Sequence, residues 1–192
     1  MKQKLTVIVI VLLSVFGVKE AKAQGIAVKT NLAGWAMFAP NIGVDLCVSE
    51  CSSIEAIFYK SVADSWLKIA ITKLKRCENA NFTALQLGYR YWFGREPLNS
   101  LFCGVTATPA RYDVKINDSK RKGDCLPFGV NIGYCYPLND KINIEVSYGI
   151  GALYLYEDIF SVSNQGEEMK TSRHNMSFSP TNIEIGISYI IK

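Results

Sequence analysis

The sequence predicts an all-β fold: an antiparallel up-and-down transmembrane β-barrel of about eight strands, preceded by an export signal. Three observations predict this fold. Apolar and polar residues alternate with a period of two along several segments. Short and long polar connections alternate between these segments, and the polar face of the strands carries glycine and charged side chains. Beyond the export signal, no apolar run approaches the ~20 residues that a membrane-spanning helix needs.

Residues 1–23 have the layout of a secretory signal peptide. Lys2 and Lys4 precede a short apolar run, and Ala21-Lys22-Ala23 supplies the small residues of a cleavage site. We therefore expect residues 24–192 to form the mature protein, a length that suits one domain. The signal peptide contains four of the 21 basic and one of the 17 acidic side chains, so the mature chain is close to neutral. The basic balance of the precursor therefore gives no indication of nucleic-acid binding.

The strand pattern is clearest in residues 142–151, where Ile142, Ile144 and Val146 alternate with polar residues and glycine. A tilted strand needs ~9–11 residues to cross a bilayer, and most of the alternating segments are near that length. The other segments are 26–33, 41–48, 53–60, 85–93, 100–114, 126–136 and 182–191.

The connections between these segments are of two kinds. Short turns are expected at Ser49–Ser52, Gly94–Asn99 and Pro137–Asp140. Longer polar connections are expected at 61–80, 115–125 and 158–178, with a smaller one near Gly34–Pro40. The two kinds alternate strictly, as in a membrane meander with short periplasmic turns and longer outer loops. A soluble Greek-key sandwich would have no reason to keep that order.

The polar face predicts a lumen filled by ion pairs. A small barrel of about eight strands is filled by side chains, which disfavours an open pore. Because a buried charge is costly unless it is paired, we expect the inward charges to form a network. Carboxylates outnumber bases, so some carboxyl groups must be hydrated or protonated. The members of this predicted network are Lys29, Asp45, Glu55, Arg90, Glu145 and Glu184.

Two basic clusters lie in the predicted long connections. They are Lys73, Lys75 and Arg76 in one connection, and Lys120, Arg121 and Lys122 in the next. In outer loops these side chains would lie beside the phosphorylated headgroups of lipopolysaccharide and bind them electrostatically. The alternative is an ordinary solvated loop.

Aromatic residues and the last strand fit an outer-membrane barrel. The spacing of Gly186, Tyr189 and Ile191 follows the terminal strand signal of outer-membrane proteins. Aromatic side chains near strand ends would form interfacial girdles around the apolar band. The residues assigned to these girdles are Tyr89, Tyr91, Trp92, Phe93, Tyr134, Tyr136, Tyr154, Tyr156 and Tyr189.

Several short motifs carry a resemblance to a known family. They are Ala27-Val28-Lys29-Thr30-Asn31-Leu32, Pro40-Asn41-Ile42-Gly43-Val44, Leu87-Gly88-Tyr89-Arg90-Tyr91-Trp92-Phe93, Phe128-Gly129-x-x-x-Gly133-Tyr134 and Glu145-x-x-x-Gly149-x-Gly151. In this order and spacing the chain resembles the uncharacterised family, a domain of unknown function, of short outer-membrane β-barrel proteins common in Bacteroidota and often associated with fimbrial loci. The resemblance implies the outer membrane of a Gram-negative bacterium. Outer-membrane lipid, lipopolysaccharide and possible fimbrial or envelope proteins are the expected partners, and no nucleic acid, catalytic residue or cofactor is implied.

We therefore expect a small non-enzymatic protein with a structural, surface or envelope and fimbrial assembly role. One alternative is a secreted soluble β-sandwich that acts as a binding or adhesion module. Another is a lipid-modifying outer-membrane enzyme built around His174, with Ser172, Ser177 and Asp158 in the same connection.

The cysteines predict neither a metal site nor a cofactor. The chain has six cysteines and one histidine, without a Cys-x-x-Cys pair, so their spacing matches no compact metal site. Cys77 and Cys125 lie in two polar connections and could form a disulfide if those connections meet.

Overall fold

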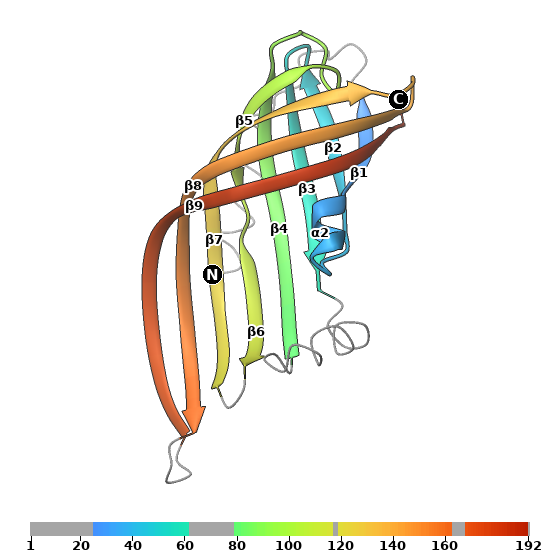
Figure 1. The fold of residues 1–192 in the computed structure, drawn as a ribbon. Helices are drawn as coiled ribbons and strands as arrows, with labels where there is room; N and C mark the ends of the chain where they lie inside the picture. The colour runs from blue at the N-terminus through green and yellow to red at the C-terminus, as the bar shows by residue number, and fades with distance from the viewer. Residues whose placement is uncertain (1–24, 62–78, 117–118, 163–167, 192) are drawn as a thin grey trace, which may run out of the picture.

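In a computed structural model, residues 25–61, 79–116, 119–162 and 168–191 are described, and the predicted signal peptide lies outside these ranges. The nine strands in these ranges form a single antiparallel sheet that closes into a ring (Figure 1). Their order is β3-β2-β1-β9-β8-β7-β5-β4-β6, and β3–β4 and β7–β6 pairings complete the ring. The strands are β1 Ile26–Asn31, β2 Asn41–Ser49, β3 Ser52–Lys60, β4 Asn79–Trp92, β5 Leu101–Ala107, β6 Ala110–Ile116, β7 Ser119–Pro137, β8 Ile142–Val162 and β9 Glu168–Ile190.

Strands β5 and β6 share one position in the ring, because both lie between β4 and β7. The ring therefore has eight positions, and all consecutive strands pair with each other except β5 and β6, which each pair with β4 and β7. The prediction of an all-β, up-and-down barrel of about eight strands is confirmed. The alternative of a β-sandwich is wrong, because one continuous sheet replaces two stacked sheets.

The alternation in the sequence sorts residues to the two faces of the ring as predicted. In β2, Gly43 and Asp45 are buried inside, whereas Ile42 and Val44 are exposed outside. The contrast is large elsewhere too: Val130 is 59% exposed on the outer face, whereas Arg90 is 0% exposed inside. Successive side chains of a strand point to opposite faces, so the period of two is enough to make one face apolar and the other polar.

The prediction that 115–125 and 158–178 are connections is wrong. Strands β6 and β7 continue through most of the first segment, and β8 and β9 continue through most of the second. These extensions lack a regular apolar face, and the strands there pair through their backbones, for example Lys122 with Asp158. Backbone hydrogen bonds hold such a sheet together whatever the side chains are, so polarity alone cannot distinguish it from a loop. Of the predicted connection 61–80, the structure describes only residue 61 and residues 79–80.

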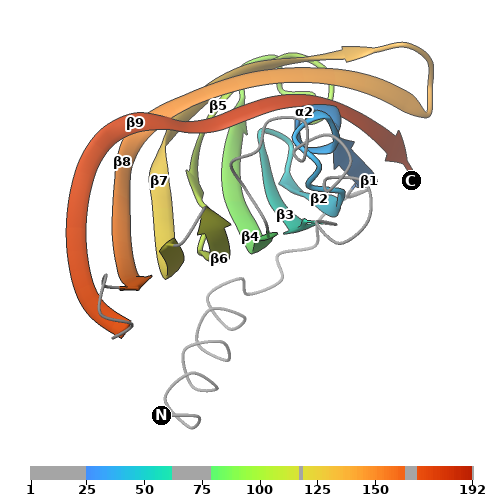
Figure 2. The same cartoon turned by 60° about the horizontal axis from the view of Figure 1, so that its bottom comes forward.

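In the described residues, the barrel is closed at the end that carries the short turns and open at the other end. Strand β1 pairs with β9 only over Gly186–Ile190, and the chain then enters helix α2, Leu32–Ala36. The predicted connection near Gly34–Pro40 thus begins as a short helix. Beyond that level β7, β8 and β9 curve away, and from the open end the strands follow an arc from β9 to β1 (Figure 2). Within the described ranges, no helix is long and apolar enough to cross a membrane.

A close contact between strands marks the bend. The ladder shifts register between β8 and β9 at Gly149 and Ile150, so β9 has one additional residue there. At Gly129 on β7, an added Cβ would meet the carbonyl oxygen of Ile150 and would lie 2.7 Å from Thr181 Oγ1. A side chain at position 129 would therefore push β7 and β8 apart, which explains the need for glycine.

Candidate functional site

The structure brings together the six charged residues that the sequence predicts for the lumen. They come from six strands: Lys29 from β1, Asp45 from β2, Glu55 from β3, Arg90 from β4, Glu145 from β8 and Glu184 from β9. All six are at most 2% exposed. The register of the strands places them at similar heights along the barrel, because Asp45 lies opposite Glu55 and Glu145 lies opposite Gly186. The polar parity of each strand then points every one of these side chains inward.

Lys29 is the hub of one half of this network. Its Nζ lies 3.0 Å from Glu55 Oε2, 3.3 Å from Glu145 Oε1 and 2.7 Å from Glu184 Oε1. The pair with Glu184 is close but lacks hydrogen-bond alignment, since Glu184 Oε1 has no hydrogen-bond partner. One ammonium group thus contacts three buried carboxylates, and this reduces their mutual repulsion.

Arg90 is the second hub and contacts all four carboxylates. Its Nη1 lies 3.2 Å from Asp45 Oδ2 and 2.8 Å from Glu145 Oε1. Its Nη2 lies 3.1 Å from Glu184 Oε2 and also pairs with Glu55 Oε2. The guanidinium carbon sits 4.6 Å above the ring centroid of Phe102, a cation–π arrangement. The planar group can serve several acceptors at once, which a lysine in this position could not do as well.

Neutral polar side chains complete the network. Gln86 Nε2 donates to Glu55 Oε1 at 2.9 Å, and Ser147 Oγ donates to Glu184 Oε2 at 3.3 Å. Tyr59 in turn donates to Gln86 Oε1 at 3.3 Å. Gln86 thus binds the Glu55 oxygen that neither cation contacts, whereas Ser147 adds a second donor to the Glu184 oxygen that Arg90 also contacts. Such donors matter because four carboxylates face two cations.

An apolar plug closes the lumen at the short-turn end. Trp92 and Phe102 contact each other with ring centroids 4.8 Å apart, and Trp92 Nε1 donates to Ser53 Oγ at 3.0 Å. The turn after β4 folds Leu98 into the barrel mouth, where its carbonyl oxygen accepts a hydrogen bond from Asn143 Nδ2 at 2.7 Å. Leu98 has a φ of 69°, a left-handed conformation that this inward fold requires.

The assignment of Trp92 to an interfacial girdle is wrong, because its side chain is fully buried in the lumen. The sequence already indicated an inward side chain, because Trp92 is two residues after Arg90 and therefore lies on the same face of β4. Leu98 could not have been found in this way, because it lies in a turn, where the two-residue period does not apply.

The second predicted basic cluster lies on a strand and is split between two faces. Lys122 Nζ lies 3.1 Å from Asp113 Oδ2 on the outer face, and Lys120 Nζ lies 3.9 Å from the same atom. Arg121 points to the inner face, where its Nη1 lies 4.0 Å from Glu157 Oε2. Lys73, Lys75 and Arg76 lie outside the described residues.

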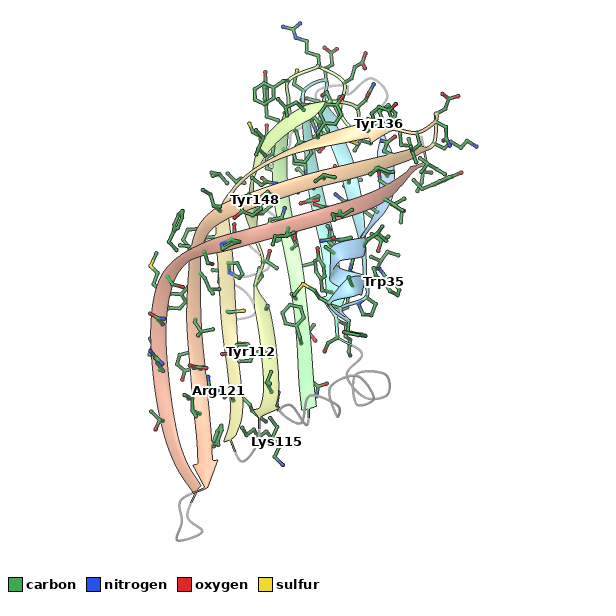
Figure 3. All side chains as sticks on the ribbon, in the orientation of Figure 1. Trp35, Tyr112, Lys115, Arg121, Tyr136 and Tyr148 are labelled. Atoms are coloured by element: carbon green, nitrogen blue, oxygen red, sulfur yellow. The ribbon has the colours of Figure 1, made fainter. Side chains whose placement is uncertain are left out.

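Inside the extension, Tyr112 forms a second polar contact with Glu157. Its hydroxyl donates to Glu157 Oε2 at 3.3 Å. Burial of the phenol, together with the nearby carboxylate, raises the pKa of Tyr112 to about 12. This contact lies beyond the apolar belt of the barrel, near the open end, where Figure 3 labels Tyr112 and Arg121.

The residues considered for catalysis do not form a nucleophile–base pair in this geometry. Ser172 Oγ donates to Asp158 Oδ1 at 2.7 Å, so its proton points at the carboxylate and not at the imidazole. His174 instead packs against Tyr156, with ring centroids 4.6 Å apart and ring planes tilted by 52°. Ser177 lies on the other face of β9 from Ser172 and His174, and it faces inward opposite Leu153. Within the described ranges, no group of three or more His, Cys, Asp or Glu side chains is placed to hold a metal ion.

The terminal residues occupy the positions that the strand pattern implies. Gly186 faces the lumen and pairs with Asn31, whereas Tyr189 is exposed on the outer face of β9 and Ile191 follows the strand. The cysteine pairing considered from the sequence concerns Cys125, which lies half-buried on β7, and Cys77, which lies outside the described residues.

Comparison with known proteins gives a matching family and a solved structure with partial resemblance. No curated protein matches the chain. A solved structure that resembles it is the crystal structure of a major outer membrane protein from Thermus thermophilus, at 12% identity and a TM-score of 0.47, covering 88% of this chain and 100% of that chain. A family described as "Protein of unknown function (DUF3575)" matches residues 6–191. Because the match spans nearly the whole sequence, the chain belongs to the DUF3575 family.

Proposed function

We propose that this protein is a small integral barrel of the outer membrane of a Gram-negative bacterium, of the kind common in Bacteroidota, with a non-enzymatic structural, surface or envelope and fimbrial assembly role. One observation carries the proposal: the apolar side chains lie outside the ring and the ions lie inside. Ile183 is 58% exposed and Val130 is 59% exposed, whereas Glu184 and Arg90 are fully buried. In water this arrangement would be unfavourable, whereas in lipid it is the expected one.

Aromatic side chains support a bilayer position. Tyr136 is exposed near the short-turn end, and Tyr148 is exposed further along β8 (Figure 3). Tyr91 and Phe93 contact each other edge-to-face on the outer side of β4 and the turn after it, with ring centroids 5.5 Å apart. Amphipathic rings at such positions favour the headgroup region on either side of the hydrocarbon.

The filled lumen supports a role other than transport through the barrel. The ion-pair network and the apolar plug occupy successive levels of the ring, and barrels with aqueous channels need ~16 or more strands. Planar-bilayer recordings of the refolded protein should therefore show no stable conductance steps. Discrete, reproducible channels would contradict the sealed barrel.

The central experiment is cell fractionation with a gel assay. The protein should sediment with the outer membrane and partition into detergent micelles. Unboiled samples should migrate faster than boiled ones, because a closed barrel resists unfolding by detergent. A mature chain that stays folded and monomeric in plain buffer would refute the proposal.

A second candidate function is contact with lipopolysaccharide. Lys120 and Lys122 face outward on β7, beyond the apolar belt, where headgroup phosphates would lie. Reversing both charges should reduce lipopolysaccharide co-purification. Reversing Arg121, which faces inward, is the matched control and should leave it unchanged. Equal effects of the two changes would argue against a headgroup site on the outer face.

A further inference from the structure

Over much of its length, one edge of β9 pairs with no other strand in the part of the chain that the structure describes. Strand β1 pairs only with Gly186–Ile190, and the Asn31 side chain extends that contact to the Ile183 carbonyl at 3.1 Å and the Ile185 amide at 3.2 Å. From Glu168 to Asn182, the only strand that pairs with β9 within the described ranges is β8. Residues 171–178 are all exposed. An open strand edge presents unpaired N–H and C=O groups, which can pair with another strand.

The hydrogen-bond pattern identifies the residues that face this edge. The Ile191 amide donates toward β1, to the Ile26 carbonyl, whereas the Ile190 amide donates to the Lys141 carbonyl, on the β8 side. Odd-numbered residues of this part of β9 therefore face β1. The register shift beside Gly149 adds one residue, so even-numbered residues face the open edge from Pro180 toward the N-terminal end of β9. Pro180 has no amide hydrogen and begins this run, a place that a strand tolerates only at an edge.

The open edge reaches into the level of the lipid-facing belt. Phe178 lies opposite Ala152, which lies opposite Phe128 on the next strand. Phe128 and Phe178 are both exposed on the outer face. This step rests on the proposed function: hydrocarbon offers no hydrogen bonds, so backbone groups at this depth need a strand partner.

The geometry of a membrane barrel excludes a second copy as that partner. Barrel strands tilt by ~35–45° from the membrane normal. Two copies in one membrane are related most simply by a two-fold axis along that normal. Their β9 strands would then cross at twice the tilt, ~70–90°, and could not form a ladder. A strand from a different protein has no such restriction.

Side chains along the edge set the chemistry of the partner. Arg173 is the single charged side chain in 171–180, is exposed, and has no ion-pair partner within the described part of the chain. Met176 and Phe178 are exposed by 64% and 78%. A complementary strand would place a carboxylate near Arg173 and apolar side chains beside Met176 and Phe178.

We propose that the open edge of β9, residues Thr171–Phe178, accepts an extended strand of another protein by β-augmentation. The partner strand is apolar where it passes Met176 and Phe178, and acidic where it passes Arg173. Backbone hydrogen bonds provide the affinity, and these side chains provide the orientation.

The test uses the full mature protein folded in detergent micelles and two fluorescent synthetic peptides. One peptide alternates Val and Thr in one half and Thr and Glu in the other. The two halves are phased so that Val shares the outer face with Met176 and Phe178 and Glu shares the inner face with Arg173. The second peptide has Lys in place of Glu. Fluorescence anisotropy should show that the Glu peptide binds about tenfold more tightly than the Lys peptide. Arg173→Glu should reverse that preference. Arg111→Glu is the matched control, because Arg111 pairs with Asp124 and lies on β6, which has a strand on both sides. This change should leave the preference for the Glu peptide unaltered.

Two further measurements test whether the backbone of β9 binds the peptide. Phe178→Pro removes an edge amide without removing a bond to β8 and should abolish binding, whereas Phe178→Ala, which keeps the amide, should retain it. Should the proline variant not fold, amide exchange of the unchanged protein decides the matter. The Glu peptide should slow exchange at Ser172, His174 and Met176, but not at the amides that already bond to β8.

Three results would overturn the inference. They are equal binding of the two peptides, protection of the edge amides before any peptide is added, and a dimer through β9 detected by light scattering. Micelle partition and heat-modifiable migration are measured first. If they fail, the proposed function fails, whereas if they hold and no peptide binds, only the inference about β9 fails.

Discussion

Replacing Arg90 by methionine tests whether the ion-pair network holds the barrel together. Arg90 contacts four carboxylates, and Asp45 has no other ion-pair partner among the described residues. The variant keeps a side chain of similar length but leaves Lys29 alone against Asp45, Glu55, Glu145 and Glu184. Removing one partner of a buried ion pair costs about 3–5 kcal/mol. Because Arg90 serves several pairs, we expect the upper part of that range.

The assay is urea unfolding of the protein in lipid vesicles, followed by tryptophan fluorescence and by the gel shift between folded and unfolded forms. Arg90→Met should lower the free energy of unfolding by about 4–5 kcal/mol, a large part of the ~5–15 kcal/mol of a typical domain. Lys141→Met, in an exposed turn, is the matched control and should change it by at most about 0.5 kcal/mol.

A double variant separates loss of pairing from loss of packing. Asp45→Asn removes the carboxylate that depends on Arg90, so Arg90→Met should cost less in that background. A loss below about 1 kcal/mol for Arg90→Met, without coupling to Asp45, would refute the view that buried ion pairs stabilise this lumen.

The other predictions test the outer face, the plug and the extension. Val130→Arg should cost about 2–4 kcal/mol in vesicles if this face meets lipid, and a change within experimental error would place the face in water. Trp92→Ala should cost about 3–5 kcal/mol, measured by the same unfolding assay, because it empties the plug against Phe102; a cost below about 1 kcal/mol would argue against a tightly packed plug. For Tyr112 the folded-state pKa of about 12 exceeds the ordinary value of 10, so its contribution to stability is present below pH 10 and is lost as the pH rises toward 12. The difference in tyrosinate absorbance between the unchanged protein and Tyr112→Phe should therefore have its midpoint near pH 12, whereas a midpoint near 10 would mean that Tyr112 is solvated.

The candidate site was predictable because its residues follow the strand period. Glu145 and Glu184 belong to clear alternating segments, and parity alone points them inward. The contacts were not predictable, because strand register determines which inward residues meet. A shift of one residue in the β8–β9 ladder would turn Glu184 outward.

In the extensions of β6 to β9, the two-residue alternation of apolar and polar side chains does not predict the strands. Residues 119–125 are polar on both faces, so they give the same pattern as a solvated loop. Pairing with β6 and β8 makes this segment a strand and sends Arg121 to the face opposite Lys120 and Lys122. The basic cluster in the sequence is therefore two separate groups in the folded protein.

The sequence by itself determined the class of fold, the number of ring positions and the inward side of the six lumen charges, because these depend only on alternation along single strands. The tertiary structure decided how far β8 and β9 extend, that Trp92 and Leu98 plug the lumen, and that one edge of β9 has no strand partner among the described residues. These features depend on pairing between segments far apart in the chain. Backbone hydrogen bonds supply that pairing, and they leave no period in the side chains.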